Sequence, residues 1–293
     1  MINIAVMTFM YRGNIDKGEL THEDLVKLCA AGGAKGLEAF DRDFVDKPSL
    51  LPLYKKLLAD NGMTMPVVDV ITNLVYGNAA QKQKGIDDLR RGLDICAELG
   101  SEIAHVAGHS PVEGVTLDDA RNMIADTLAA HAPMAKARGL TLGIEDFDPS
   151  PTLICSAADC LAILKRAKGT VKLVFDTGNF MAAGESAERN LPLMYDHICS
   201  FHVKDYGRDP DGSLRGELVR VLGDPVAEGR GCVSAARAGD IHESLVDGDR
   251  LDQRGEARQD REYLPRHRLV TRHVRAREDS AGATPVRFAR RHG

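Results

Sequence analysis

The chain of 293 residues predicts a (β/α)8-type TIM barrel. From residue 2 to 205, short apolar runs alternate strictly with stretches of helical periodicity, and the connections between them are short. No Gly-rich dinucleotide-binding or phosphate-binding turn follows the first apolar run, which argues against an open Rossmann sheet. Seven βα units suit an eight-stranded barrel better than an open sheet of five or six strands. We therefore expect a closed, largely parallel barrel.

The expected strands are short, rich in β-branched residues and bounded by turn residues. They span 2–9, 36–41, 65–72, 102–108, 140–146, 171–177 and 200–205. The expected helices lie between them, near 22–32, 49–61, 79–99, 116–138, 156–168 and 187–197.

Capping residues support these boundaries. N-cap residues are expected at Thr21, Thr116 and Ser156, because a side-chain oxygen there can accept a free backbone N–H of the first turn. Glycines follow the ends of four helices, where a left-handed residue commonly ends a helix: Gly62, Gly100, Gly139 and Gly169.

Composition restricts the class of protein. The first residues show no signal peptide, and no segment approaches the roughly 18 consecutive apolar residues of a membrane helix. The six cysteines are scattered and form no CxxC pair, which argues against a disulfide framework or a cysteine zinc site. We predict a cytoplasmic protein with no membrane partner.

The charge distribution divides the chain in two. Residues 1–228 hold 24 Lys and Arg against 33 Asp and Glu, a net charge of −9 that argues against a nucleic-acid partner. Residues 229–293 hold 14 Arg, no Lys and 10 acids, a net charge of +4. We predict a TIM-barrel catalytic domain of seven βα units over 1–228 and an Arg-rich, atypical segment over 229–293.

The segment 229–293 has neither a sustained strand pattern nor a clean amphipathic helix, so we expect it to be aberrant or disordered. One hypothesis is translation in a shifted reading frame of a GC-rich gene; resequencing near codon 229 tests it, and an intact frame would refute it. The alternative is a genuine basic tail that is disordered or binds a partner. Without an eighth strand, the first and seventh strands would keep unpaired edges, which predicts low stability or association into homo-oligomers.

Three neighbouring strands end in residues that suit a metal site. Strand alternation places Glu145, Asp176 and His202 on the face opposite the apolar residues, at the carboxyl ends where TIM barrels build active sites. Two buried carboxylates and an imidazole would repel or desolvate one another without a cation. Oxygen-rich ligation with one His predicts one divalent ion, Mn²⁺, Mg²⁺ or Co²⁺, with Zn²⁺ as an alternative.

The order of four short motifs, GLEAF, GIEDF, VFDTGN and SFHVKD, resembles the xylose-isomerase-like TIM barrels, often described as sugar phosphate isomerases or epimerases. The resemblance covers about residues 2–206. It implies that Glu145, Asp176 and His202, with a Glu of the eighth strand, bind one divalent metal. It also implies that Glu145 and the eighth-strand Glu are the acid/base pair of proton transfer next to a carbonyl.

Two features depart from that family. Many relatives have His where this chain has Asn179, which can bind a hydroxyl but cannot exchange protons near neutral pH. The expected loop, helix and eighth strand ending in Glu are not recognisable after residue 229. By elimination alone, Glu243, Glu256 and Glu262 are candidates for the lost ligand.

Other polar residues on or after the strands suit a sugar-sized substrate. Glu38, Asp69, His105 and His109 could bind hydroxyl or carboxylate groups, although a lone strand His such as His105 is about as often a satisfied core residue. Lys204 is a candidate catalytic residue that would neutralise an enediolate, or it only balances the charge of Asp176 or Asp205.

These residues predict a metal-dependent isomerase or epimerase that acts on a small sugar-like ketone or aldehyde by proton transfer through an enediolate. One alternative is a dehydratase of a cyclic keto-polyol, of the inosose or dehydroshikimate type, which product analysis would distinguish by loss of water. An endonuclease IV-type nuclease would need more metal ligands and a basic face. The alternative from another class is a catalytically inactive barrel that acts as a binding protein.

Overall fold

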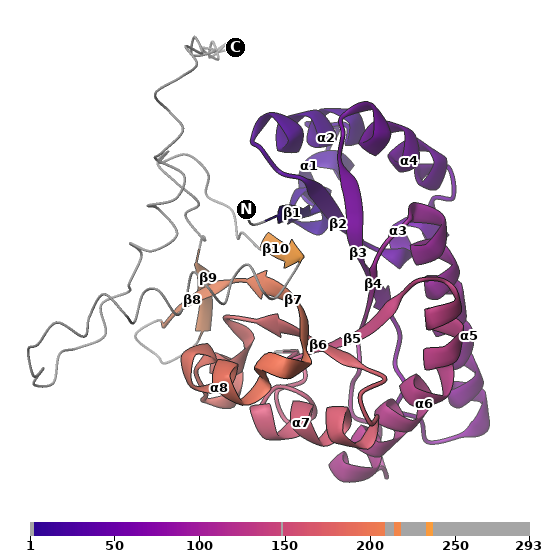
Figure 1. Ribbon diagram of the computed structural model, residues 1–293, viewed down its shortest axis with the longest axis vertical. Coiled ribbons are helices and arrows are strands. Elements are labelled where there is room, and N and C mark those ends of the chain that lie inside the picture. Colours follow the sequence, from indigo (N-terminus) through magenta and orange to yellow (C-terminus); the bar gives the residue numbers. More distant parts are fainter. Residues whose placement is uncertain (1–2, 148, 209–213, 218–232, 237–293) are drawn as a thin grey trace, which may run out of the picture. The chain divides into compact units, whose positions relative to one another are not determined.

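The structure, a computed structural model, describes residues 3–147, 149–208, 214–217 and 233–236. Its main sheet is a closed barrel with the strand order β1-β10-β7-β6-β5-β4-β3-β2. Strands β1 to β7 run parallel to one another, and the helices lie outside the ring of strands (Figure 1). The predicted TIM-barrel fold is confirmed.

All seven predicted strands are present, with shifts of a few residues at their ends. Their bounds are β1 Asn3–Met7, β2 Gly36–Phe40, β3 Thr64–Ile71, β4 Ile103–Ala107, β5 Thr141–Glu145, β6 Lys172–Asp176 and β7 Ile198–Val203.

The six predicted helices correspond to α2 His22–Ala31, α4 Leu50–Asp60, α5 Ala79–Leu99, α6 Leu117–Ala137, α7 Ala157–Arg166 and α8 Ala187–Met194. The last turn of the predicted helix 187–197 is a separate short helix, η3 Tyr195–His197. Short helices that we did not predict follow the ends of the first, second and sixth strands. They are η1 Thr8–Tyr11, α1 Arg12–Asp16, α3 Asp41–Asp46 and η2 Asn179–Ala183.

The predicted caps explain where the helices begin and end. The side chain of Thr21 accepts the N–H of Asp24 and that of Ser156 accepts the N–H of Asp159, each in a reciprocal capping box. Thr116 caps α6 with a single bond, because its side chain accepts the N–H of Asp119. The four predicted helix-ending glycines all have a positive φ between 63° and 79°, a conformation that costs glycine little.

Close packing of α5 on β3 depends on one glycine. A β-carbon at Gly92 would lie 2.3 Å from Cγ1 of Val70, far inside van der Waals contact. Because Gly92 lets the helix approach, Val70, Leu89 and Leu93 are fully buried between the barrel and its helical layer.

The strand at the eighth position of the barrel differs from what we predicted from the sequence. We expected no sustained strand after residue 229, but β10, Val233–Ala236, lies between β1 and β7 and pairs antiparallel with both. Its register places Ser234 beside His202 on one side and Ala5 on the other. The prediction that β1 and β7 keep unpaired edges is therefore wrong, because β10 covers both.

A second small sheet follows β7 directly. Strands β8, Asp205–Arg208, and β9, Leu214–Glu217, form an antiparallel pair. The predicted boundary at residue 228 and the segment 229–293 other than β10 lie outside the described residues.

Candidate active site

The three predicted metal ligands meet at the carboxyl ends of adjacent strands. Glu145 ends β5, Asp176 ends β6, and His202 lies beside Asp176 in the register of β6 and β7. Each offers one ligand atom, and these atoms all lie within 4.8 Å of one another in a buried position. The parallel strands produce this convergence, because they bring their carboxyl ends to one rim of the barrel.

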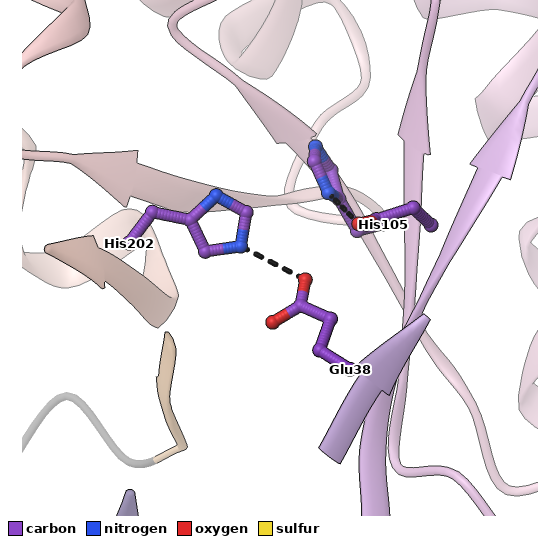
Figure 2. A group of neighbouring side chains, drawn as sticks. Glu38, His105 and His202 are labelled. Atoms are coloured by element: carbon purple, nitrogen blue, oxygen red, sulfur yellow. Dashed lines mark hydrogen bonds and ion pairs between the residues drawn. The ribbon is translucent and has the colours of Figure 1, made fainter. Parts of the chain in front are cut away.

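His202 lies between two carboxylates that come from non-adjacent strands, β2 and β5. Its Nδ1 is 2.5 Å from Oε1 of Glu145. Its Nε2 is 2.9 Å from Oε1 of Glu38 (Figure 2). Glu38 belongs to β2 and is 164 residues away in the sequence. An imidazole that faces a carboxylate with both nitrogens is in the arrangement of a protonated, doubly donating ring.

Asp176 is held by the turn that follows its own strand. Its Oδ1 accepts the backbone N–H of Gly178 at 2.7 Å and that of Asn179 at 2.9 Å. Its Oδ2 is buried and has no hydrogen-bond partner among the described residues, although Nζ of Lys204 lies 3.5 Å away. The turn fixes the carboxylate and leaves one oxygen directed at the site.

Lys204 and Asn179 are also brought together at this rim. Nζ of Lys204 donates to Oδ1 of Asn179 at 2.5 Å. The backbone N–H of Lys204 donates to Oγ1 of Thr177 at 3.0 Å, which anchors the residue just after β7. The ammonium is therefore positioned 3.5 Å from Oδ2 of Asp176, a contact that both the catalytic and the charge-balancing interpretation of Lys204 allow.

Asp69 and His105 complete the polar interior on the side of β3 and β4. Nδ1 of His105 is 2.5 Å from Oδ1 of Asp69, and its Nε2 is 3.7 Å from Oε2 of Glu145. The His105 and His202 rings meet edge to face, with centroids 5.2 Å apart. Three of the predicted substrate-binding residues, Glu38, Asp69 and His105, are thus part of one buried cluster with the predicted ligands.

His109 does not join this cluster through its polar contacts. Its Nδ1 lies 3.4 Å from the backbone N of Leu74, and its carbonyl oxygen accepts the Ser150 hydroxyl at 2.6 Å. The residue is buried beyond the end of β4. These contacts favour a structural role, so the predicted substrate contact of His109 stays a prediction.

The acids and imidazoles of the cluster shift each other's pKa values. Burial alone would raise the pKa of Glu145, but the nearby His202 and His105 outweigh it and hold that pKa below its usual range. Burial would likewise lower the pKa of His202, yet the Glu38 and Glu145 carboxylates raise it well above the ordinary value. The imidazolium therefore compensates the buried acids.

The negative charges of Asp69 and Asp176 are less well compensated by nearby positive charges. Burial, together with the charge of Glu38, raises the pKa of Asp69 to about 7. Burial raises the pKa of Asp176 to about 6, in spite of the neighbouring Lys204. Both groups would be more stable as carboxylates beside an added cation.

Asp146 is a buried acid that the sequence analysis missed. It follows Glu145 directly, just after the end of β5. Its Oδ1 accepts the backbone N–H of Asp176 at 2.8 Å, and burial followed by the charge of Asp176 raises its pKa well above normal. The sequence signal was the second acid of the GIEDF motif. Because β5 ends at Glu145, strand alternation does not determine the direction of the Asp146 side chain.

The strand in the eighth position has no carboxylate. The residues of β10 are Val233, Ser234, Ala235 and Ala236, so this strand cannot supply the Glu that the family resemblance implies. The candidates Glu243, Glu256 and Glu262 lie outside the described residues.

A sequence profile described as "Xylose isomerase-like TIM barrel" matches residues 26–252, more than half of the chain. The chain belongs to the xylose isomerase-like TIM barrel family. No curated protein matches the chain by sequence.

Solved structures of this xylose isomerase-like family share the fold at low identity. A probable 3-DHS dehydratase from Bacillus anthracis has 13% identity and a TM-score of 0.58, over 71% of this chain and 75% of that chain. A D-psicose 3-epimerase has 19% identity and a TM-score of 0.57, over 65% and 72%. A protein of Sinorhizobium meliloti 1021 has 21% identity and a TM-score of 0.51, over 60% of this chain and 63% of its own length. These similarities support the fold and not a particular activity.

Among the described residues, no helix combines the length and the apolar character needed to cross a membrane.

Proposed function

We propose that this barrel is a divalent-metal-dependent isomerase or epimerase. It would act on a small sugar or a sugar-like ketone or aldehyde by proton transfer through an enediolate. The observation that carries the proposal is the convergence of Glu145, Asp176 and His202, within 4.8 Å of one another, at the carboxyl rim of the barrel.

The donor set fits a divalent metal ion. Two carboxylates and one imidazole are ligands that Mn²⁺, Mg²⁺, Co²⁺ or Zn²⁺ accept, and Oδ2 of Asp176 is a buried oxygen without a hydrogen-bond partner among the described residues. A bound ion would polarise the substrate carbonyl and stabilise the negative charge that develops on its oxygens.

Glu145 is the residue we assign to proton transfer. Its carboxylate is buried, its pKa is held low, and one of its oxygens faces His202 while the other faces His105. A base of this kind removes the proton next to a carbonyl. In isomerisation it would return that proton to the neighbouring carbon while another proton moves between the two oxygens. In epimerisation a second acid would deliver a proton to the opposite face of the same carbon.

Lys204 is the residue we assign to charge stabilisation. Its ammonium lies at the rim, 3.5 Å from Asp176 and hydrogen-bonded to Asn179. At that place a cation would stabilise an enediolate or bind a substrate carboxylate, while Asn179 would bind a hydroxyl.

The family supports an enzyme of this general type. Its solved members include a D-psicose 3-epimerase and a protein titled as a sugar phosphate isomerase/epimerase. They also include a probable 3-DHS dehydratase, which keeps the dehydratase alternative in view. The acidic barrel body and the small enclosed polar cluster favour a small-molecule substrate over nucleic acid.

Hydrogen exchange on candidate substrates tests the proposal. The full chain, freed of metal and then reloaded with Mn²⁺, is incubated in D₂O with a panel of keto-sugars and keto-polyols. We expect deuterium at the carbon next to the carbonyl, dependent on Mn²⁺ and lost in Asp176→Asn. Release of water from the product would instead identify a dehydratase. Mn²⁺ binding without exchange would favour a binding protein, and the absence of both would refute the proposal.

A further inference from the structure

A cavity of about 530 Å³ lies beside the carboxyl ends of β1, β2 and β3. Residues of the helices α1 to α4 complete its walls. Pockets for small molecules commonly measure about 300–1,000 Å³, so this volume is sufficient for a ring-shaped molecule. Among the described residues that line the cavity, none belongs to the proposed metal-ligand set. The cavity is therefore distinct from the buried cluster described above.

The cavity borders the same rim of the barrel as the candidate active site. Phe40, the last residue of β2, and Ile71, the last residue of β3, both line it. Phe40 lies two positions after Glu38, and Ile71 lies two positions after Asp69. Side chains two positions apart on a strand share a face, so Phe40 and Ile71 form the layer above these acids. A molecule in the cavity would lie at the rim where TIM barrels bind their ligands.

Apolar and aromatic side chains form the inner wall of the cavity. Phe44, Leu50 and Tyr54 line it and are between 3% and 8% exposed. The Tyr54 ring meets the Phe44 ring edge to face at a centroid distance of 5.7 Å, and it meets the His22 ring in the same way at 5.4 Å. Nδ1 of His22 also lies 2.8 Å from the Tyr54 hydroxyl. These contacts fix the wall, so the cavity is largely preformed.

The charged groups around the cavity balance one another. Three cations and three carboxylates line it: Arg12, Arg42, Lys47, Asp16, Asp43 and Asp46. Arg12 forms an ion pair with Asp43. Burial, and next the charge of Lys47, lower the pKa of the His22 imidazole, so this ring is neutral at neutral pH. A lining without net charge does not favour an anion or a cation. Its mixture of donors and acceptors suits hydroxyl groups, which can do both.

One buried hydroxyl at the cavity has no partner. Thr8 follows β1, lines the cavity and is 5% exposed. Its Oγ1 is buried and has no hydrogen-bond partner among the described residues. An unpaired buried polar atom is destabilising and calls for a group that binds it. The hydroxyl of a ligand could either donate to this oxygen or accept from it.

We propose that this cavity binds an uncharged, hydroxylated ring such as a pyranose. The apolar wall would contact the C–H groups of the ring, and Thr8 and the charged side chains would bind its hydroxyls. Such a ring has two sources. It is either a free sugar or the distal ring of a disaccharide-type substrate whose reacting end lies at the metal site. The proposal goes beyond the proposed function and requires neither metal nor catalytic activity.

NMR titration of the full chain tests the proposal. The metal-free protein is titrated with the methyl pyranosides of glucose and galactose, and the His22 ring signals are followed. We expect a saturable shift of these signals. Thr8→Val keeps the shape of the side chain and should weaken binding about fivefold, through the loss of one hydrogen bond. It should not lower the thermal unfolding midpoint, because the hydroxyl that it removes is unpaired.

Two further variants define the position of the ligand. Ile15→Trp enlarges a half-buried residue of α1 that lines the cavity, and it should abolish the saturable shift. The matched control is Thr64→Val, because Thr64 is exposed at the amino end of β3, away from the rim. This control should bind the sugars as the wild type does.

The two sources of the ring are distinguished with Mn²⁺-loaded protein and the disaccharides cellobiose and lactose. A disaccharide that binds more tightly than the methyl pyranoside identifies the distal ring of a larger substrate. Equal affinities identify a free sugar.

Several outcomes overturn the proposal. These are the absence of a saturable shift with all of the sugars, or unchanged affinity in both Thr8→Val and Ile15→Trp. Tighter binding of glucuronate than of the methyl glucoside would refute an uncharged ligand. Binding that is lost in Asp176→Asn and kept in Thr8→Val would assign the sugar to the metal site. None of these results changes the Mn²⁺-dependent exchange that tests the proposed function, so the two proposals can fail separately.

Discussion

Oδ1 of Asp146 accepts a hydrogen bond from the backbone N–H of Asp176 at 2.8 Å. The bond joins the residue after β5 to the last residue of β6. It therefore links the ends of the two strands that carry the proposed ligands Glu145 and Asp176. Asp146 is fully buried, and its pKa is raised well above normal, first by burial and then by the charge of Asp176. We interpret it as a protonated acid that positions Asp176.

Replacing Asp146 tests that interpretation. A protonated acid and an amide are nearly isosteric, so Asp146→Asn should change the free energy of unfolding by less than about 1 kcal/mol. Asp146→Ala removes the acceptor of a buried N–H and should cost about 1–3 kcal/mol. Urea denaturation of the metal-free protein measures both. Equal losses in the two variants would show that Asp146 is needed as a carboxylate.

Lys204 lies close enough to Asp176 to compete with a metal ion for it. Its ammonium is 3.5 Å from Oδ2 and would repel a divalent cation. We expect Lys204→Met to bind Mn²⁺ more tightly, by about tenfold or about 1.4 kcal/mol, while catalysis falls. Calorimetric titration measures the affinity.

The matched control is Lys172→Met, because that ammonium donates to the carbonyl oxygen of Asp196, away from the cluster. Weaker Mn²⁺ binding in Lys204→Met would mean that the lysine orders the site instead of competing with the ion.

Protonation of His109 should lower the free energy of unfolding at acid pH. Burial, and to a lesser extent the charge of His105, lowers its pKa from 6.5 to about 4. Between these values the unfolded state binds more protons than the folded state, so stability falls as the pH falls from about 6.5 to about 4. The contribution of this residue across that window is about 3 kcal/mol.

Denaturation of the wild type and His109→Gln at pH 7.5 and pH 4.5 measures this contribution. The wild type should lose more stability than the variant over the interval. An identical pH dependence in both proteins would show that His109 titrates normally.

Position 92 should not tolerate any side chain, although replacing glycine by alanine usually stabilises a helix. A methyl group there would overlap Val70, since its carbon would lie 2.3 Å from Cγ1. We expect Gly92→Ala to destabilise the protein by about 1–3 kcal/mol through overpacking. Val70→Ala should relieve that overlap, so the double variant should lose less than the sum of the single losses. Additive losses would indicate that α5 does not approach β3 this closely.

β10 should contribute to stability because both of its edges are paired. A proline at position 235 has no backbone N–H to donate to either neighbouring strand, so one hydrogen bond of the sheet is lost. Ala235→Pro should therefore cost about 3 kcal/mol. Ala235→Val is the control, since β-branched residues suit strands. Equal unfolding free energies for wild type and Ala235→Pro would contradict an eighth strand at this position.

Much of the architecture was predictable because it is encoded locally. Alternating apolar runs, capping residues such as Thr21 and Ser156, and glycines after helix ends are short-range signals, and each acts through the hydrogen bonds of its own turn. The phases of Glu145, Asp176 and His202 were equally local, because side-chain alternation assigned all three to the barrel interior.

Contacts between distant residues could not be predicted in that way. The hydrogen bond between His202 and Glu38 joins residues 164 positions apart, and the role of Asp146 depends on a backbone group of the next strand. The antiparallel β10 has a weak strand pattern of its own and is selected by the exposed edges of β1 and β7.

By itself, the sequence determined the βα repeat and which side chains face inward, because both follow from backbone periodicity and hydrogen bonding within a few residues. Only the tertiary structure decided which of those side chains meet, that His202 stands between Glu145 and Glu38, and which strand closes the ring, because closure of the barrel sets those distances.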